Sequence, residues 1–215
     1  MAYTTIKKPS DYFNTKLYTG TGSAGQAQTG VGFQPDLVWT KSRSNTYPHQ
    51  WYDVIRGVTK RIQSNDTSAE ATQSNGLSSF DSDGFTVGDA SGTGVNNATY
   101  AAWNWKANGQ GSSNTDGSIN TTYTSVNTTA GFSIIKYVGN GSAGHTIPHH
   151  LGTANIGSIF VKNLDSGSDY WYSYHKPLGA TKYMRLDSTS AQITASDEFN
   201  DTEPTSTVFT VETDG

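Results

Sequence analysis

The chain carries the same succession of short motifs twice, and this internal repeat limits its possible folds more than any other feature. Tyr18–Gly25 reads Tyr-Thr-Gly-Thr-Gly-Ser-Ala-Gly, and Tyr137–Gly144 reads Tyr-Val-Gly-Asn-Gly-Ser-Ala-Gly. Four more matched pairs follow in the same order: Val38–Lys41 with Ile159–Lys162, Gln50–Tyr52 with Tyr170–Tyr172, Gly57–Lys60 with Gly179–Lys182, and Phe85–Val87 with Phe209–Val211. A spacing of about 120 residues is the length of a domain and exceeds any solenoid or propeller repeat. The sequence therefore predicts two tandem copies of one domain, an arrangement that favours binding or structural proteins because paired sites give avidity.

The amino-acid composition further limits the fold class and the possible partners. Charged residues make up 15% of the 215-residue chain and aromatic residues 12%, which is typical of an all-β protein with many turns. The net charge is −4 and no long basic run occurs, so we expect no nucleic-acid partner. The absence of cysteine excludes disulfides and thiolate ligands. No segment resembles a signal peptide or could span a bilayer, so we expect no membrane insertion and no host secretion route.

Short runs of β-branched and aromatic residues alternate with clusters of Gly, Ser, Asn and Asp, and no window has a helical period. The predicted strands are Leu37–Lys41, Trp51–Ile55, Lys60–Ser64, a strand-turn-strand over Phe80–Val87, and Tyr100–Lys106, and the second copy starts at Gly131–Val138. Phe33–Asp36 is predicted as a turn, and Gly84 is expected to adopt a positive φ. Strands at about ten-residue intervals predict antiparallel β-sandwiches.

Four segments follow from these patterns. We expect an N-terminal docking arm over residues 1–12, a first β-sandwich over 13–107, a polar linker over 108–130 in which Thr121–Ser125 is an extended piece, and a second β-sandwich over 131–215. The second copy has no counterpart of the strand Tyr100–Lys106, so it is expected to lack its final strand. Two explanations stay open: the natural chain is longer, or a neighbouring chain fills the gap.

Several motifs of the first copy together resemble a known family. They are Tyr18–Gly20, Gly32–Lys41, Arg56-Gly57, Ser64-Asn65, Ser79-Phe80, Asp83–Gly88 and Tyr100–Lys106. In this order they resemble a repeated domain of virion proteins from tailed bacteriophages, especially phages of marine bacteria and cyanophages, which are usually labelled tail fibre or structural proteins. The resemblance covers nearly all of residues 13–106 and, more loosely, 131–215. It implies a concanavalin-like or jelly-roll sandwich and carries no catalytic residues.

The resemblance implies a non-enzymatic phage virion protein, with the tail favoured over the head as its location. The first hypothesis is a tail fibre or receptor-binding component that contacts a host-surface glycan and other virion proteins, as a homo-oligomer for which a trimer is the expectation by analogy. The second is a head-decoration or other structural virion protein. The third is a polysaccharide depolymerase, placed last because no expected strand carries an alternating pair of acids.

The polar motifs favour structural roles. Asp81–Gly84 contains part of a calcium-loop pattern without the remaining ligands, and it is interpreted as a hairpin turn. Four histidines, His145, His149, His150 and His175, occur in the second copy at spacing too irregular to indicate a metal site. No Gly-x-Ser-x-Gly elbow is present, and the glycine-rich Gly20–Gly25 lacks the ending of a phosphate loop. We therefore predict no cofactor, no metal and no catalytic residue.

Aromatic residues are the best binding candidates. Trp39, Trp51 and Trp171 fall within repeat-matched strands, and Trp103 and Trp105 share one face of a strand, so we expect all five to pack in the core. Four tyrosines lie near expected loops or strand ends, where exposed rings could contact a sugar. The candidate binding residues are Tyr47, Tyr170, Tyr172 and Tyr174.

Overall fold

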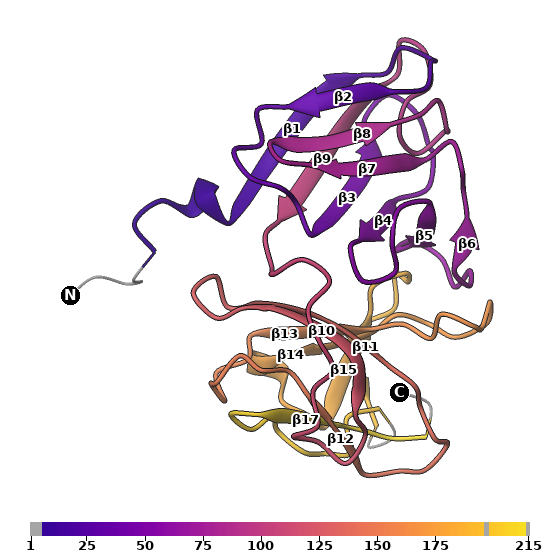
Figure 1. Ribbon diagram of the computed structural model, residues 1–215. Helices are drawn as coiled ribbons and strands as arrows, with labels where there is room; N and C mark the ends of the chain where they lie inside the picture. Colours follow the sequence, from indigo (N-terminus) through magenta and orange to yellow (C-terminus); the bar gives the residue numbers. More distant parts are fainter. Residues whose placement is uncertain (1–5, 196–197, 214–215) are drawn as a thin grey trace. The chain divides into compact units, whose positions relative to one another are not determined.

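The computed structural model describes residues 6–195 and 198–213, and there the chain is all-β, with two short 3-10 helices (Figure 1). Its sheets are built of antiparallel strands, so the predicted fold class is confirmed at this level. The chain divides into two compact units. Unit 1 takes in the chain up to Ser64, Glu70–Gly109 and Thr129–Phe132; unit 2 takes in Asn65–Ala69, Gln110–Thr128 and the chain from Ser133 onward.

The described part of unit 1 contains two sheets and one 3-10 helix. Its elements are η1 (Pro9–Asp11), β1 (Phe13–Thr19), β2 (Gln26–Thr29), β3 (Leu37–Ser42), β4 (Gln50–Asp53), β5 (Lys60–Gln63), β6 (Ala71–Thr72), β7 (Leu77–Asp81), β8 (Gly84–Val87) and β9 (Thr99–Trp105). The larger sheet has the order β1-β9-β3-β4-β5-β6, and the smaller has the order β2-β8-β7. Figure 1 shows the smaller sheet lying across β1, β9 and β3.

The core of unit 1 lies between these two sheets. Val38, Tyr52 and Ala102 face it from the larger sheet, and Leu77 and Phe85 face it from the smaller; all five are fully buried. Burying each of the larger apolar side chains stabilises the fold by about 1.5–3 kcal/mol. Successive side chains of a strand point to opposite faces, so every neighbour of these residues along the chain points away from the core.

The tryptophans of unit 1 therefore lie where we did not expect them. Trp39, Trp51 and Trp103 alternate with the core residues Val38, Tyr52 and Ala102, and all three are half-buried on the opposite face of the larger sheet. Trp105 lies on the same outer face. The prediction that these four pack in the core is wrong, because the residues that alternate with them, Val38, Tyr52, Ala102 and Asn104, take the inward positions. Trp171, at 2% exposure, is the buried tryptophan that we expected.

Most predicted strands of unit 1 are confirmed, with one that ends early. β3, β5, β7–β8 and β9 match the predictions to within a few residues. β4 ends at Asp53, two residues before the predicted end, because the Asp53 carboxylate accepts a hydrogen bond from the backbone N–H of Arg56 at 2.9 Å and turns the chain. Gly57 then adopts φ 93° and completes the turn.

The β7–β8 hairpin has the turn chemistry predicted for Asp81–Gly84. Gly84 adopts φ 149°, and a Cβ at this position would collide with the Gln28 carbonyl oxygen of the neighbouring strand. The two carboxylate oxygens of Asp83 accept the N–H groups of Gly30, at 2.9 Å, and Gly32, at 2.6 Å. These bonds lower the pKa of Asp83. The carboxylate serves as a loop tether, which agrees with the hairpin interpretation.

The described part of unit 2 has eight strands and the second 3-10 helix, and the first residue of its strand β11, Phe132, belongs to unit 1. Its elements are β10 (Thr121–Asn127), β11 (Phe132–Tyr137), β12 (His145–Pro148), β13 (Ser158–Val161), β14 (Tyr172–His175), η2 (Lys176–Leu178), β15 (Lys182–Arg185), β16 (Ile193–Thr194) and β17 (Val208–Val211). They form the sheets β13-β14-β15-β16, β12-β17 and β10-β11. The core of unit 2 includes Ile147, Tyr174 and Phe209, which are all buried, and Ile147 has no exposed surface.

The two units share strand pairings at the repeated motifs. β3-β4-β5-β6 of unit 1 corresponds to β13-β14-β15-β16 of unit 2, and β2-β8 corresponds to β12-β17. The register corrects one matched pair of the sequence. Val38 pairs with Tyr52, and Ile159, its counterpart, pairs with Tyr174 rather than with Tyr172. Tyr52 and Tyr174 are thus the equivalent core tyrosines, and Trp51 corresponds to Ser173.

The segment expected as a linker, 108–130, contains ordered structure. Its residues Thr121–Asn127 form β10, which pairs with β11 as β9 pairs with β1. The Thr121 and Thr124 hydroxyls hydrogen-bond each other at 2.8 Å in a buried position, and threonine favours strands. β11 therefore has a partner strand from the residues that precede it. Of the expected arm, residues 6–12 form η1 and its flanks, and residues 1–5 lie outside the described residues.

Candidate functional site

The outer face of the larger sheet of unit 1 carries a connected group of aromatic rings, the aromatic face, which comprises Phe13, Trp39, Trp51, Trp103 and Trp105. Strand register places Trp39 directly opposite Trp51 on one side and Trp103 on the other. The ring centroids are 5.1 Å apart for Trp39 and Trp51 and 5.4 Å apart for Trp39 and Trp103. Tilted cross-strand pairs at such distances contribute about 0.5–1.5 kcal/mol each beyond area burial.

The aromatic face continues to the edge strand β1. Trp105 stacks at 6.4 Å from Trp39, and Phe13 lies 4.9 Å from Trp105. Residues become more exposed to solvent toward β1: Phe13 is 38% exposed, and Leu17, further along the same face of β1, is 58% exposed. The indole N–H of Trp39 is buried and has no hydrogen-bond partner among the described residues.

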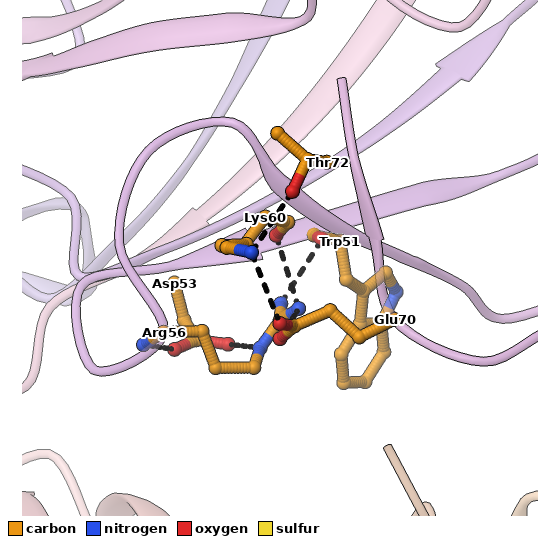
Figure 2. Close-up of polar contacts among 6 residues, drawn as sticks. All are labelled: Trp51, Asp53, Arg56, Lys60, Glu70 and Thr72. Atoms are coloured by element: carbon orange, nitrogen blue, oxygen red, sulfur yellow. Dashed lines mark hydrogen bonds and ion pairs between the residues drawn. The ribbon is translucent and has the colours of Figure 1, made fainter. Parts of the chain in front are cut away.

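A buried charge network fixes the backbone beneath Trp51 (Figure 2). Arg56 donates from Nε to Asp53 Oδ2 at 2.6 Å, from Nη2 to the Trp51 carbonyl at 3.1 Å, and from Nη1 to the Lys60 carbonyl at 3.0 Å. Its Nη1 also lies 3.4 Å from Glu70 Oε2. The side chains of Arg56 and Asp53 are only 4% and 7% exposed. A planar guanidinium can serve all these acceptors at once, which a lysine could not.

Figure 2 also shows how the network reaches the sheet edge. Lys60 donates to the Thr72 hydroxyl at 2.9 Å and lies 3.9 Å from Glu70 Oε1. Glu70 is therefore paired with two cations, Arg56 and Lys60. The arrangement is a structural clamp that joins β4, β5 and β6.

A small pocket lies at the β1 end of the aromatic face, within unit 1. It is lined by η1 and its flanks, by Phe13 and Trp105, and by the Ala130–Phe132 turn, and its volume is about 230 Å³. Phe132 stacks on Trp105 at 6.0 Å with 22° between the rings. The pocket lining thus includes four aromatic residues, Tyr12, Phe13, Trp105 and Phe132.

The structure scatters the four candidate tyrosines. Tyr174 is 1% exposed and donates its hydroxyl to Glu203 at 2.5 Å, so the expectation that it is exposed is wrong. Tyr47, Tyr170 and Tyr172 are half-buried. The guanidinium of Arg185 lies 3.6 Å from the centre of the Tyr170 ring, a cation–π contact, and Tyr172 packs edge-on to Tyr183. Burial raises the pKa of Tyr172 and of Tyr174.

The histidines of unit 2 serve separate partners. His149 is buried, accepts the Leu151 N–H at Nδ1 and lies 3.3 Å from the Thr205 carbonyl at Nε2, and burial lowers its pKa. His150 lies 3.5 Å from Asp116. In the described part of the chain, no group of three or more His, Asp or Glu residues could hold a metal ion.

His145 bonds to Ser118, and the geometry gives this pair a structural role. Asn140 accepts the Ser142 N–H at Oδ1, which directs its Nδ2 donor to His145 Nε2 at 2.9 Å. The proton of the imidazole therefore lies on Nδ1, which donates to Ser118 Oγ at 2.9 Å. In this tautomer the ring cannot accept a proton from Ser118. Gln26, the counterpart of His145, likewise holds its loop through the Thr21 N–H and the Thr19 carbonyl.

Sequence reasoning missed the aromatic face, although its parts were visible. In the strand Tyr100–Trp105, the small Ala102 and Asn104 fit a narrow core between two sheets, and both are fully buried. The core position of Tyr52 likewise forces Trp51 outward. Treating every tryptophan as a core residue hid this signal.

Comparison with known proteins gives a family without an assigned activity. No curated protein and no solved structure matches the chain. Among the described residues, no helix is long and apolar enough to cross a membrane. One family, described as "Domain of unknown function (DUF7483)", matches residues 8–215 and so takes in both units. The chain therefore belongs to the DUF7483 family.

Proposed function

We propose that this chain is a non-enzymatic virion protein of a tailed bacteriophage, a tail fibre or receptor-binding component that holds a host-surface glycan. The observation that carries the glycan-binding part is the aromatic face. Sugar rings have apolar C–H faces that pack on aromatic rings, and ligand sites are mostly apolar surfaces with a few polar groups. The virion assignment is supported by the resemblance of residues 13–106 to phage structural proteins.

The finer fold belongs to this proposal: two tandem sandwiches of jelly-roll or concanavalin-like type. It is supported by the face-to-face sheets of unit 1 and by the strand orders that the two units have in common. Homotrimerisation, attachment to other virion proteins through the N-terminal arm, and a position on the tail follow from the analogy with phage fibres.

The non-enzymatic part is supported by the roles of the reactive side chains. Glu70 pairs with Arg56 and Lys60. Glu203 accepts the Tyr174 hydroxyl and the Ala180 N–H. His145 faces Ser118 in a tautomer that cannot activate it. A depolymerase is therefore the third hypothesis, and release of reducing sugar from host polysaccharide would revive it.

A head-decoration protein is the second candidate, and the burial of the tyrosines favours it. Every described tyrosine is buried or half-buried, so the described residues offer no exposed tyrosine at a loop tip for a receptor. Leu17 and Val138 are exposed singly, which is ordinary for a protein surface and does not by itself indicate an interface.

Two experiments test the proposal. Gold-labelled antibody against the chain should decorate the tails of intact virions; label over the head would support decoration, and no label would refute the virion assignment. Binding of the purified chain to host envelope polysaccharide should fall at least tenfold in Trp103→Ala and stay unchanged in Tyr47→Ala, with folding checked by circular dichroism. The reverse pattern would move the binding site to the tyrosine loop.

A further inference from the structure

We propose that Asn140 is a site of spontaneous deamidation, and that the loss of its amide reverses the hydrogen bonds that run from residue 140 through His145 to Ser118. Asn140 and Gly141 lie in the exposed loop between β11 and β12 of unit 2. An asparagine that precedes a glycine is especially open to this reaction, because glycine has no side chain to keep its backbone nitrogen away from the amide. The site takes only water as its co-reactant and does not depend on glycan binding.

The reaction is an attack of the backbone on the side chain. The nitrogen of Gly141 attacks Cγ of Asn140, a bond forms between these two atoms, and the bond from Cγ to Nδ2 breaks. Ammonia leaves with the proton that the Gly141 nitrogen gives up, and a succinimide ring remains. Water then opens the ring at either carbonyl and leaves aspartate or isoaspartate. Both products carry a carboxylate in place of the amide.

The structure distinguishes this pair from the other Asn-Gly pairs of the chain, which occur at residues 75–76 and 108–109. In those pairs a hydrogen bond holds the glycine nitrogen in place: Gly76 donates to the Gln73 carbonyl at 3.0 Å, and Gly109 donates to the buried Asp36 carboxylate at 3.1 Å. The Gly141 N–H has no hydrogen-bond partner among the described residues. A Cβ on Gly141 would meet nothing within 4 Å. Its nitrogen is therefore the one most free to move toward the amide.

The amide of Asn140 is held in a state that favours attack. Its Oδ1 accepts the Ser142 N–H at 3.1 Å. A backbone donor aimed at a carbonyl oxygen stabilises the negative charge that develops there when a nucleophile adds to the carbon. In the first copy of the motif, Thr21 stands at the matched position, so that loop has no amide to lose.

The amide of Asn140 also decides which nitrogen of His145 carries the proton. Asn140 Nδ2 donates to His145 Nε2 at 2.9 Å, so the proton lies on Nδ1, which donates to Ser118 Oγ at 2.9 Å. A carboxylate can only accept. After deamidation, Nε2 must therefore carry a proton to keep a bond to residue 140, and Ser118 can then donate to Nδ1.

Peptide mapping of the folded full chain during incubation at neutral pH measures the reaction at each pair. Asn140 should deamidate at least about fivefold faster than the other two pairs, the factor that corresponds to one hydrogen bond of about 1 kcal/mol. Thr21→Asn is the matched control, because it places an asparagine in the same exposed motif before Gly22, whose N–H donates to the Gly94 carbonyl at 2.9 Å. This variant should react as slowly at residue 21 as the two held pairs do. Unfolding the chain in urea should remove the differences.

Two results would overturn the site: equal rates at all the pairs of the folded chain, or a Thr21→Asn pair that reacts as fast as Asn140. Sequence alone would then set the rate. Nitrogen NMR of the His145 imidazole tests the reversal. Nε2 should carry no proton in the fresh chain and should carry one in the aged chain and in Asn140→Asp, with thermal melts to verify folding. An Nε2 without a proton in both altered forms would show that the reversal is wrong.

Discussion

Replacing Arg56 by methionine should destabilise unit 1 far more than breaking a surface ion pair of the same length. Arg56 and Asp53 are 2.6 Å apart and almost fully buried, at 4% and 7% side-chain exposure. Lys8 and Asp11 are also 2.6 Å apart, but they are 70% and 50% exposed. Lys8→Met is therefore a control in which sequence spacing and distance match and only burial differs.

The magnitude follows from what each substitution leaves behind. Arg56→Met strands the Asp53 carboxylate in a buried position, a change that costs about 3–5 kcal/mol. It also removes the donor to the Trp51 and Lys60 carbonyls, each worth about 1 kcal/mol if left unsatisfied. Lys8→Met should cost only about 0–1 kcal/mol. Arg56→Lys should fall between them, because an ammonium group retains the charge and loses the planar fork.

Urea unfolding followed by tryptophan fluorescence measures the difference. Trp39, Trp51, Trp103 and Trp105 all belong to unit 1, so the signal mainly reports the unit that contains Arg56. With a urea slope of about 1–3 kcal/mol/M, Arg56→Met should lower the midpoint by about 1 M or more. Equal midpoints for Arg56→Met and Lys8→Met would refute the reasoning that burial makes this pair structurally important.

Three further predictions concern individual residues. Gly84→Ala should destabilise unit 1 by about 2–4 kcal/mol, because the added Cβ would collide with the Gln28 carbonyl oxygen. Gly25→Ala is the control: its φ is also positive but its Cβ would meet open space, so it should cost only about 1–2 kcal/mol, and urea unfolding midpoints measure the difference. Burial lowers the pKa of His149 below its ordinary value of 6.5, so below that pH the unfolded state binds more protons than the folded state. The stabilising contribution of neutral His149 is therefore fully present above about pH 6.5 and is lost as the pH falls toward the pKa of the folded state. Thermal melts across pH 4–8, an interval around the ordinary histidine pKa, should show a smaller decline for His149→Asn. Tyr174→Phe should destabilise unit 2 by about 1–2 kcal/mol, because Glu203 loses the hydroxyl donor beside a buried ring; an unchanged melting temperature would contradict this.

Period-two patterning was enough to predict the strands but not which face of each strand points inward. Trp51 and Tyr52 are both large aromatic residues, and neither hydropathy nor size says which one faces the core. The choice is made by the opposite sheet, since Tyr52 must pack with Leu77 and Phe85, residues that come much later in the chain. Long-range pairing of this kind is absent from any local window.

The linker was harder to interpret for a different reason. Residues 108–120 have little to bury, but Thr121–Asn127 has the β-branched content of a strand. What makes it a strand is a partner, β11, that lies just beyond the intervening turn. The extended piece expected at Thr121–Ser125 is therefore confirmed as part of β10, but composition alone does not show which strand it pairs with.

The repeat itself bears on how strongly such a protein could hold a surface. The residues that both units have in common at matched positions are structural: Lys41 and Lys162 each bind carbonyls of the loop that follows their strand, and Tyr52 and Tyr174 each fill a core. The aromatic face is not duplicated in this way, because register places Phe160 where Trp39 stands and Ser173 where Trp51 stands.

Within the part of the chain that the structure describes, there is therefore one aromatic face rather than two. Avidity would then have to come from association of several chains, since only separate copies of unit 1 would supply repeated sites. This reverses the first inference from the tandem motifs, in which the repeat itself supplied the multiplicity. It also ties the receptor-binding proposal to oligomerisation: a chain that stays monomeric at virion-like concentration should hold a glycan surface only as weakly as one site allows.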